Sequence, residues 1–161
     1  MGVKLKMTLR RTNPNAFKWL YKVQKEVEKL NRGGVTIGIH PEDDAREDGR
    51  SNSTIAADHE FGLHNPARPF FRPTLARQAP ARLQINAIYR EGLNKALRGQ
   101  GTIKAVQIKA GKMMVAAIKE TIDKGVPPPN APSTVKRKGH GRTLRDTLQM
   151  RNAIKYKVKG E

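Results

Sequence analysis

The chain has 161 residues, and 32 lysines and arginines against 14 aspartates and glutamates give it a formal net charge of +18. It contains no cysteine, which excludes a disulfide framework and a thiolate metal site, and we find neither an apolar stretch of membrane-spanning length nor a signal peptide. We therefore expect a single domain over residues 1–161, in a reducing and soluble setting, with an acidic or polyanionic partner.

Residues 2–10 alternate apolar and polar side chains with a period of two, which predicts a strand with one buried face. Asn13 followed by Pro14 is typical of a helix start, and an apolar stripe with helical spacing predicts a helix over residues 14–31. A glycine pair ends that helix. The alternation resumes over residues 34–41, where we expect a second strand.

Residues 41–53 are polar, and we expect them to form a loop. Half of the acidic residues of the chain lie between positions 42 and 60, so the sequence predicts one acidic patch on a basic protein. The spacing of these acids does not fit a calcium loop, and we expect no metal site. A solvated loop is the plain interpretation, and contact with a basic surface of a neighbouring subunit is the functional one.

Helical spacing over residues 74–98 predicts a second helix, which Pro80 either starts afresh or kinks. A glycine-rich break follows, and a third helix is predicted over residues 102–124. Gly111 lies in the middle of this third helix, where glycine costs about 1 kcal/mol relative to alanine unless something packs closely against it.

Residues 125–142 combine prolines, glycines and basic residues, and we expect an extended, flexible loop. The last alternation covers residues 153–159 and places Lys155, Lys157 and Lys159 on the wet face of a third strand. These elements predict an α+β fold. Its small antiparallel or mixed sheet packs an apolar face against about three helices and turns a basic face to solvent or to a partner.

Residues 59–75, with the sequence HEFGLHNPARPFFRPTL, hold three of the four phenylalanines together with three prolines and two arginines. We expect a rigid, extended connector, because each proline fixes φ and restricts the residue before it. Aromatic and arginine side chains on a stiff backbone lose little freedom on docking, which favours contact with another protein. The sequence leaves open whether the aromatic side chains face the chain's own core or a neighbour.

His59 and Glu60 are adjacent residues of types that can act in acid–base catalysis. Consecutive side chains on an extended segment point apart, so contacts with the backbone or with an arginine are the simpler interpretation. The chain has no nucleophile motif, phosphate-binding loop or dinucleotide-binding turn, and we expect no enzyme and no cofactor. A small nuclease or other hydrolase that uses these two residues is the weakest alternative.

The basic run at Lys136, Arg137 and Lys138 has the charge to neutralise several phosphates. Aromatic residues are not interleaved with this run, and helix-turn-helix and zinc-finger signatures are missing. The alternative hypothesis for the whole chain is therefore a basic nucleic-acid-binding module without sequence specificity.

Two segments, residues 55–75 and 127–158, together resemble the neck and tail-completion proteins of tailed bacteriophages, including the virion-morphogenesis proteins of Mu-like phages. The matching features run in order over residues 34–158. They are a hydrophobic-Gly-hydrophobic strand at 35–39, a variable loop, the EFG…PARPF-aromatic-RP segment at 60–73, two helices, a P-x-T-x-x-R-K-G stretch at 132–139 and an ending that starts at Asp146-Thr147.

The chain departs from this family pattern at two positions. Leu148 stands where the family usually has glycine, and Asn152 replaces the common small hydroxyl residue. A glycine after Asp146-Thr147 would relieve strain at positive φ, so the departure at Leu148 concerns the local turn.

The resemblance implies a non-enzymatic virion protein that is assembled in the cytoplasm of a bacterial host. Such a protein forms a homo-oligomeric ring, a hexamer or dodecamer, between the head connector and the tail, contacts other neck, connector and tail proteins, and lets double-stranded DNA pass. No membrane contact is expected. We expect subunit or neck contacts at Asp43, Asp44, Glu47, Phe61, Arg68, Phe70, Phe71 and Arg72. A basic face that lines a DNA channel or binds acidic partners is expected at Lys155, Lys157, Lys159, Lys136, Arg137 and Lys138.

Overall fold

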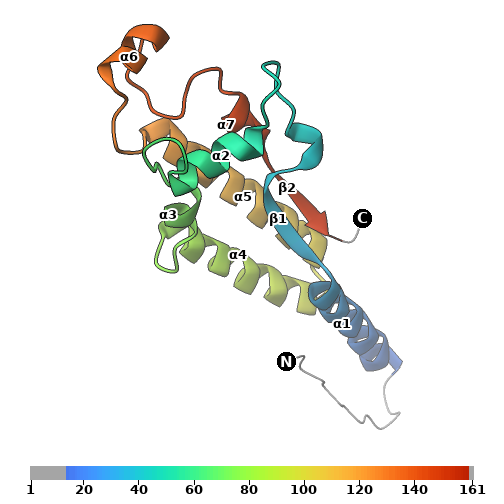
Figure 1. Ribbon diagram of the computed structural model, residues 1–161. Coiled ribbons are helices and arrows are strands. Elements are labelled where there is room, and N and C mark those ends of the chain that lie inside the picture. Colours follow the sequence, from blue (N-terminus) through green and yellow to red (C-terminus); the bar gives the residue numbers. More distant parts are fainter. Residues whose placement is uncertain (1–13, 160–161) are drawn as a thin grey trace.

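The computed structural model describes residues 14–159, and within this range the side chains of residues 18–28 and 33–159. Figure 1 shows the α+β arrangement. In chain order the described elements are α1 (Pro14–Arg32), β1 (Gly34–Ile39), the 3-10 turn η1 (Pro41–Asp43), α2 (Asn52–Phe61), α3 (Phe71–Leu75), α4 (Pro80–Leu97), α5 (Ile103–Lys124), α6 (Pro132–Lys138), α7 (Gln149–Ala153) and β2 (Ile154–Lys159). The strand predicted over residues 2–10 lies outside the described residues.

The sheet consists, within the described part of the chain, of β1 and β2 in an antiparallel pair. The register runs from Gly34 opposite Lys159 to Ile39 opposite Ile154. Along β2 the lysines are exposed, while the apolar residues between them are buried or half-buried. The two predicted strands and their separation into an apolar and a basic face are therefore confirmed.

Helix α5 lies along the sheet, and α4 packs against α5 (Figure 1). Both contacts are close because a glycine stands at each of them. A Cβ atom on Gly111 of α5 would lie 2.6 Å from Cδ2 of Tyr156 in β2, and one on Gly92 of α4 would lie 2.2 Å from a methyl group of Val106 in α5. The cost of a glycine inside α5 is therefore offset by the close approach of the sheet.

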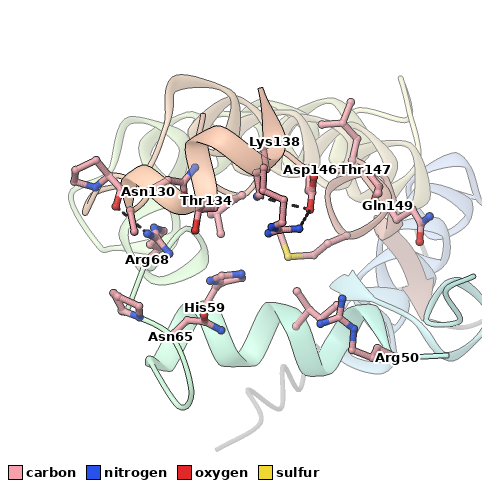
Figure 2. Close-up of a pocket in the computed structure, with 18 of the residues that line it drawn as sticks. Arg50, His59, Asn65, Arg68, Asn130, Thr134, Lys138, Asp146, Thr147 and Gln149 are labelled. Atoms are coloured by element: carbon pink, nitrogen blue, oxygen red, sulfur yellow. Dashed lines mark hydrogen bonds and ion pairs between the residues drawn. The ribbon is translucent and has the colours of Figure 1, made fainter. Parts of the chain in front are cut away.

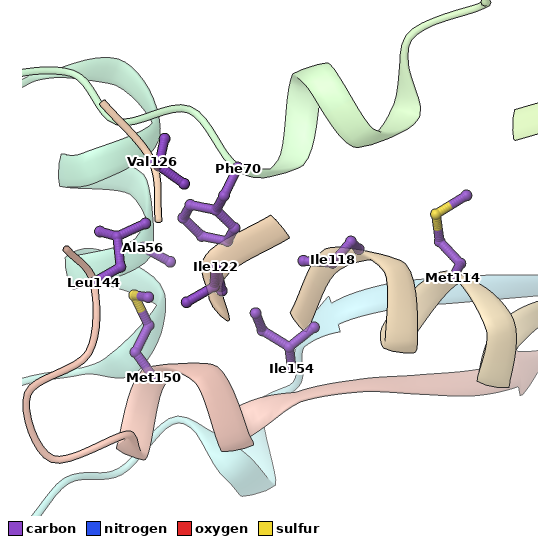
Figure 3. Packing of buried hydrophobic residues seen from close by; sticks show 9 residues of the cluster. All are labelled: Ala56, Phe70, Met114, Ile118, Ile122, Val126, Leu144, Met150 and Ile154. Atoms are coloured by element: carbon purple, nitrogen blue, oxygen red, sulfur yellow. The ribbon is translucent and has the colours of Figure 1, made fainter. Parts of the chain in front are cut away.

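The hydrophobic core lies around the C-terminal half of α5, where α2, α7 and the chain before α3 meet it (Figure 3). Its buried members are Ala56, Phe70, Met114, Ile118, Ile122, Val126, Leu144, Met150 and Ile154. Apolar side chains from segments far apart in sequence thus share one cluster, which positions the segments described below.

The described residues form seven α-helices where about three were predicted. Helix α4 begins at Pro80, so the fresh start predicted there as one of two alternatives is confirmed, whereas α3 begins at Phe71, ahead of the predicted range 74–98. The loop predicted over 125–142 contains α6, which begins at Pro132, and the loop predicted over 41–53 contains η1 and the start of α2. Proline fixes φ near the helical value and needs no partner for a missing N–H at a helix start, so here it begins helices.

The expected extended connector over residues 59–75 is also wrong at both ends, because its first residues belong to α2 and its last residues to α3. Local capping defines α2. The Ser51 hydroxyl accepts the backbone N–H of Thr54 at 3.0 Å, and Gly62 ends the helix in the left-handed conformation.

Candidate interaction site

The carboxylate of Glu60 organises the segment that follows α2. Only 4% of the residue is exposed. Its oxygens accept the backbone N–H groups of Phe70, Phe71 and Arg72 at 2.8–2.9 Å, and the Arg72 Nε at 3.0 Å. Burial by itself raises the pKa of this carboxyl group, but the three backbone donors and Arg72 outweigh burial, so the pKa lies below its ordinary value. The predicted contact of Glu60 with backbone and arginine is confirmed.

Arg68 joins the segment after α2 to the proline-rich chain before α6. Its side chain is buried, with Nε donating to the Pro128 carbonyl at 2.8 Å and Nη2 to the Pro129 carbonyl at 3.0 Å. These bonds use the guanidinium group inside the chain, so Arg68 is a structural residue here rather than an exposed contact residue.

The phenylalanines of this segment divide between core and surface. Phe70 is fully buried in the core, and Phe71 is half-buried against it. Phe61 is 60% exposed, with the Arg72 guanidinium carbon 5.0 Å from its ring centroid, and the nearby Leu63 is 63% exposed. Phe70 therefore belongs to the chain's own core, whereas Phe61 and Arg72 are accessible to a partner.

The acidic loop finds basic partners within the same chain. Asp43 forms an ion pair with Lys155, and Glu42 forms one with Lys157. The hydrogen bond from Lys157 holds the pKa of the Glu42 carboxyl below its ordinary value. Two of the three outward lysines of β2 are thus partly neutralised, and Lys159 is exposed at the end of the strand.

The other two predicted acidic contact residues differ from each other. Asp44 accepts the backbone N–H of Ser53 at 2.6 Å and the Ser53 hydroxyl at 2.9 Å, so it stabilises the start of α2. Glu47 is exposed in the same loop. Of the acidic residues in the predicted contact set, Glu47 is therefore the one at the surface without a capping role or an ion pair shown by the structure.

An open cleft of about 660 Å³ lies between α2, α6 and the chain that leads into α7 (Figure 2). Its cationic and histidine lining is Arg46, Arg50, His59, Arg68, Arg137 and Lys138. Asp146 is the one acidic residue among the described residues that line it. Of the predicted basic run, Arg137 and Lys138 line this cleft, and Lys136 is exposed outside it.

Two buried polar atoms in the cleft lack a hydrogen-bond partner in the described part of the chain, namely Nδ1 of His59 and Oε1 of Gln149. Figure 2 shows His59 rising from α2 into the cleft. Burial lowers the pKa of its imidazole, and the positive charges of Arg68 and Lys138 lower it further, so the neutral ring is favoured.

Sequence reasoning missed the cleft because its walls come from distant stretches of chain. Arg46 and Arg50 lie in the predicted loop 41–53, while Asn130 and Gln149 lie more than 70 positions further on. Period and spacing report only local structure. No local pattern in the sequence shows that these stretches meet.

None of the described helices is both long and apolar enough to cross a membrane. No group of three or more histidine, aspartate or glutamate side chains is placed to hold a metal ion within residues 14–159. Comparison of the chain with protein-family models, with curated proteins and with solved structures found no match.

Leu148, which precedes α7, adopts the left-handed conformation, with φ 61°. A Cβ atom is strained there, and glycine is not. We expect Leu148→Gly to be more stable than Leu148→Ala by about 1 kcal/mol, because both lose the leucine side chain and only alanine keeps the strain. Urea unfolding of the two variants measures this difference.

Leu83, an exposed residue inside α4, provides the matched control. At a helical position the order reverses, and Leu83→Gly is expected to be less stable than Leu83→Ala by about 1 kcal/mol. Equal stability of the two Leu148 variants, or a more stable alanine variant, would contradict a strained backbone at residue 148.

Proposed function

We propose that this chain is a structural, non-enzymatic subunit of a tailed-phage particle. Its role is that of a neck or tail-completion protein, which forms a homo-oligomeric ring, a hexamer or dodecamer, and joins the tail to the head connector while DNA passes. Its partners are further copies of itself and other neck, connector and tail proteins. It is assembled in the cytoplasm of the bacterial host and stays in the virion.

The observation that supports an assembling role is the exposed pair Phe61 and Leu63 on a firmly held segment. The Glu60 carboxylate fixes the chain that follows them through three backbone hydrogen bonds. An exposed aromatic ring beside a leucine and an arginine has the composition of an interface core. Little freedom is lost when such a surface docks, because the backbone is already ordered.

The kind of assembly comes from the resemblance to the phage proteins. The hydrogen bonds of Arg68 to Pro128 and Pro129 support the use of this resemblance, because they hold the two segments that carry it together as one structural unit. If the two segments lay on opposite sides of the molecule, the resemblance would support this kind of assembly less strongly.

The second candidate is the basic nucleic-acid-binding module, and the observation that favours it is the concentration of cationic side chains in the cleft. Phosphate neutralisation by such residues gives an affinity that falls steeply as salt rises. The DNA arm of the experiment in the next section separates this candidate from protein binding.

Disruption of the gene in the phage genome that encodes it tests the proposed function. We expect electron micrographs of lysates to show tailless heads beside free tails, as a joining protein requires. Overlong tails would indicate a tail terminator instead. Infectious particles of normal shape would contradict a role in the neck or in tail completion.

Complementation of the disrupted phage then tests the contact surface. A plasmid-borne Phe61→Ser/Leu63→Ser variant is expected to restore at least about tenfold fewer plaques than the unchanged chain, since each exposed anchor contributes on the order of 1 kcal/mol or more to docking. Leu83→Ser, an equally exposed leucine on α4, is the control and should complement fully. Both variants must keep the unfolding transition of the unchanged protein.

A further inference from the structure

We propose that the cleft between α2 and α6 binds an acidic, partly apolar peptide segment of a partner protein. This inference goes beyond the proposed function, because it assigns a ligand class to a site distinct from the exposed pair Phe61 and Leu63. The cationic side chains and the apolar lining of the cleft support this assignment.

The cationic side chains of the cleft differ in how closely they already pair with carboxylates of the same chain. Arg46 and Arg50 both contact the Asp48 carboxylate, at 3.1 and 2.9 Å. Arg137 and Lys138 form weaker ion pairs, because their nitrogen atoms lie 3.8 and 3.9 Å from the same atom, Oδ2 of Asp146. Arg137, whose side chain is 69% exposed, is therefore the cation most available to an incoming carboxylate, while 11% of the Lys138 side chain is exposed.

Asp146 marks the position that a ligand carboxylate would take. Its side chain is half exposed, and it is the one acidic group that lines the described cleft. Figure 2 shows it beside Lys138. A peptide carboxylate that approaches the same two cations has to compete with Asp146, so removal of this acid should favour binding.

The rest of the lining suits a peptide better than a nucleic acid. Apolar side chains from both sides of the core line the cleft, namely Ile55, Leu144, Leu148 and Met150, and three prolines, Pro66, Pro128 and Pro129, add apolar walls. No aromatic residue lies among these lining residues, so bases have no stacking platform. Apolar ligand side chains, in contrast, have a surface to cover.

The chain's own acidic loop is a poor source for this peptide. Glu42 and Asp43 are bound to lysines of β2, and Asp44 is bound to Ser53 at the start of α2. A second copy of the chain would have to break these contacts to supply the same residues, and without breaking them this group of four acids offers Glu47 alone, one carboxylate for two cations. The occupant is therefore assigned to a different protein, whose segment carries free carboxylates next to apolar residues.

Fluorescence anisotropy with the purified full chain tests this inference. The probe is a fluorescein-labelled peptide of alternating glutamate and leucine, and the comparison probes replace leucine with serine or glutamate with lysine. We expect the glutamate–leucine peptide to bind most tightly. Arg137→Gln/Lys138→Gln should weaken its binding about tenfold, because two charges that face the ligand are lost.

Matched variants separate the cleft from the general positive charge of the protein. Lys112→Gln/Lys136→Gln removes the same two charges from exposed positions outside the cleft and should change binding by less than about twofold. Asp146→Asn should tighten binding, whereas Glu120→Gln on α5 removes an equal charge elsewhere and should not.

Three results would overturn the inference. They are equal binding of the leucine and serine peptides, equal effects of the two double variants, and displacement of the peptide by duplex DNA at lower concentration with a steep salt dependence. The last result would support nucleic-acid binding instead. Peptide binding is measured without phage assembly, so its failure and the failure of complementation are seen separately.

Discussion

Replacement of Phe70 with alanine is expected to lower the free energy of unfolding by about 3–5 kcal/mol, the range for a fully buried phenylalanine. The ring has no exposed surface and contributes to the cluster around Ile118 and Ile122. Alanine removes the apolar contacts and leaves a cavity that the neighbouring helices fill only in part. Urea unfolding monitored by circular dichroism measures the loss.

Phe61→Ala is the matched comparison, because it removes the same side chain nine residues earlier. We expect a change within about 1 kcal/mol, since the ring is largely exposed and loses mainly its contact with Arg72. A large loss at Phe61 together with a small loss at Phe70 would reverse the assignment of core and surface in this segment.

Glu60→Gln is expected to destabilise the protein by about 3 kcal/mol at neutral pH, because three backbone N–H groups and Arg72 lose a charged acceptor. The effect depends on pH with a definite sign. The folded-state pKa of Glu60 is lowered, so its stabilisation is fully present above the ordinary glutamate value of about 4.5 and is lost as pH falls through the folded-state pKa.

The pH series compares the unfolding free energies of the unchanged chain and the Glu60→Gln variant from neutral to acidic conditions. The gap between them should shrink in acid. Glu120→Gln, whose side chain is exposed on α5 and pairs with Lys124, should stay within about 0.5 kcal/mol of the unchanged chain. If the unchanged chain and Glu60→Gln had equal unfolding free energies at neutral pH, or if their difference grew on acidification, the stabilising role of the Glu60 carboxylate would be disproved.

The elements that the sequence predicted well are those with a regular period over their whole length. Helix α5 and strand β2 repeat their apolar residues without interruption, and even Gly111 was expected to need a close neighbour, which is Tyr156. Helix α2 was missed because it lacks an apolar stripe and depends on its caps at Ser51 and Gly62. Those two cap residues were the signal that could have found it.

The contact residues were predicted as types but not as positions in space. Arginines and phenylalanines on the segment 59–75 suggested a docking surface, and sequence could not show that Phe70 turns inward while Phe61 stays outside. The same holds for Asp43 and Glu42, because their lysine partners lie more than 100 positions later in the chain. Contacts at such separations are set by packing of the whole fold, and no local pattern reports them.

The two glycine contacts of α5 have a mechanical consequence. A slide or rotation of α5 by one residue would bring a side chain to the place where Gly111 meets Tyr156. A shift of α4 would in the same way bring a side chain against Val106 in place of Gly92. The sheet, α5 and α4 are therefore expected to move as one rigid unit, and α6 lies outside the two close contacts that hold this unit together.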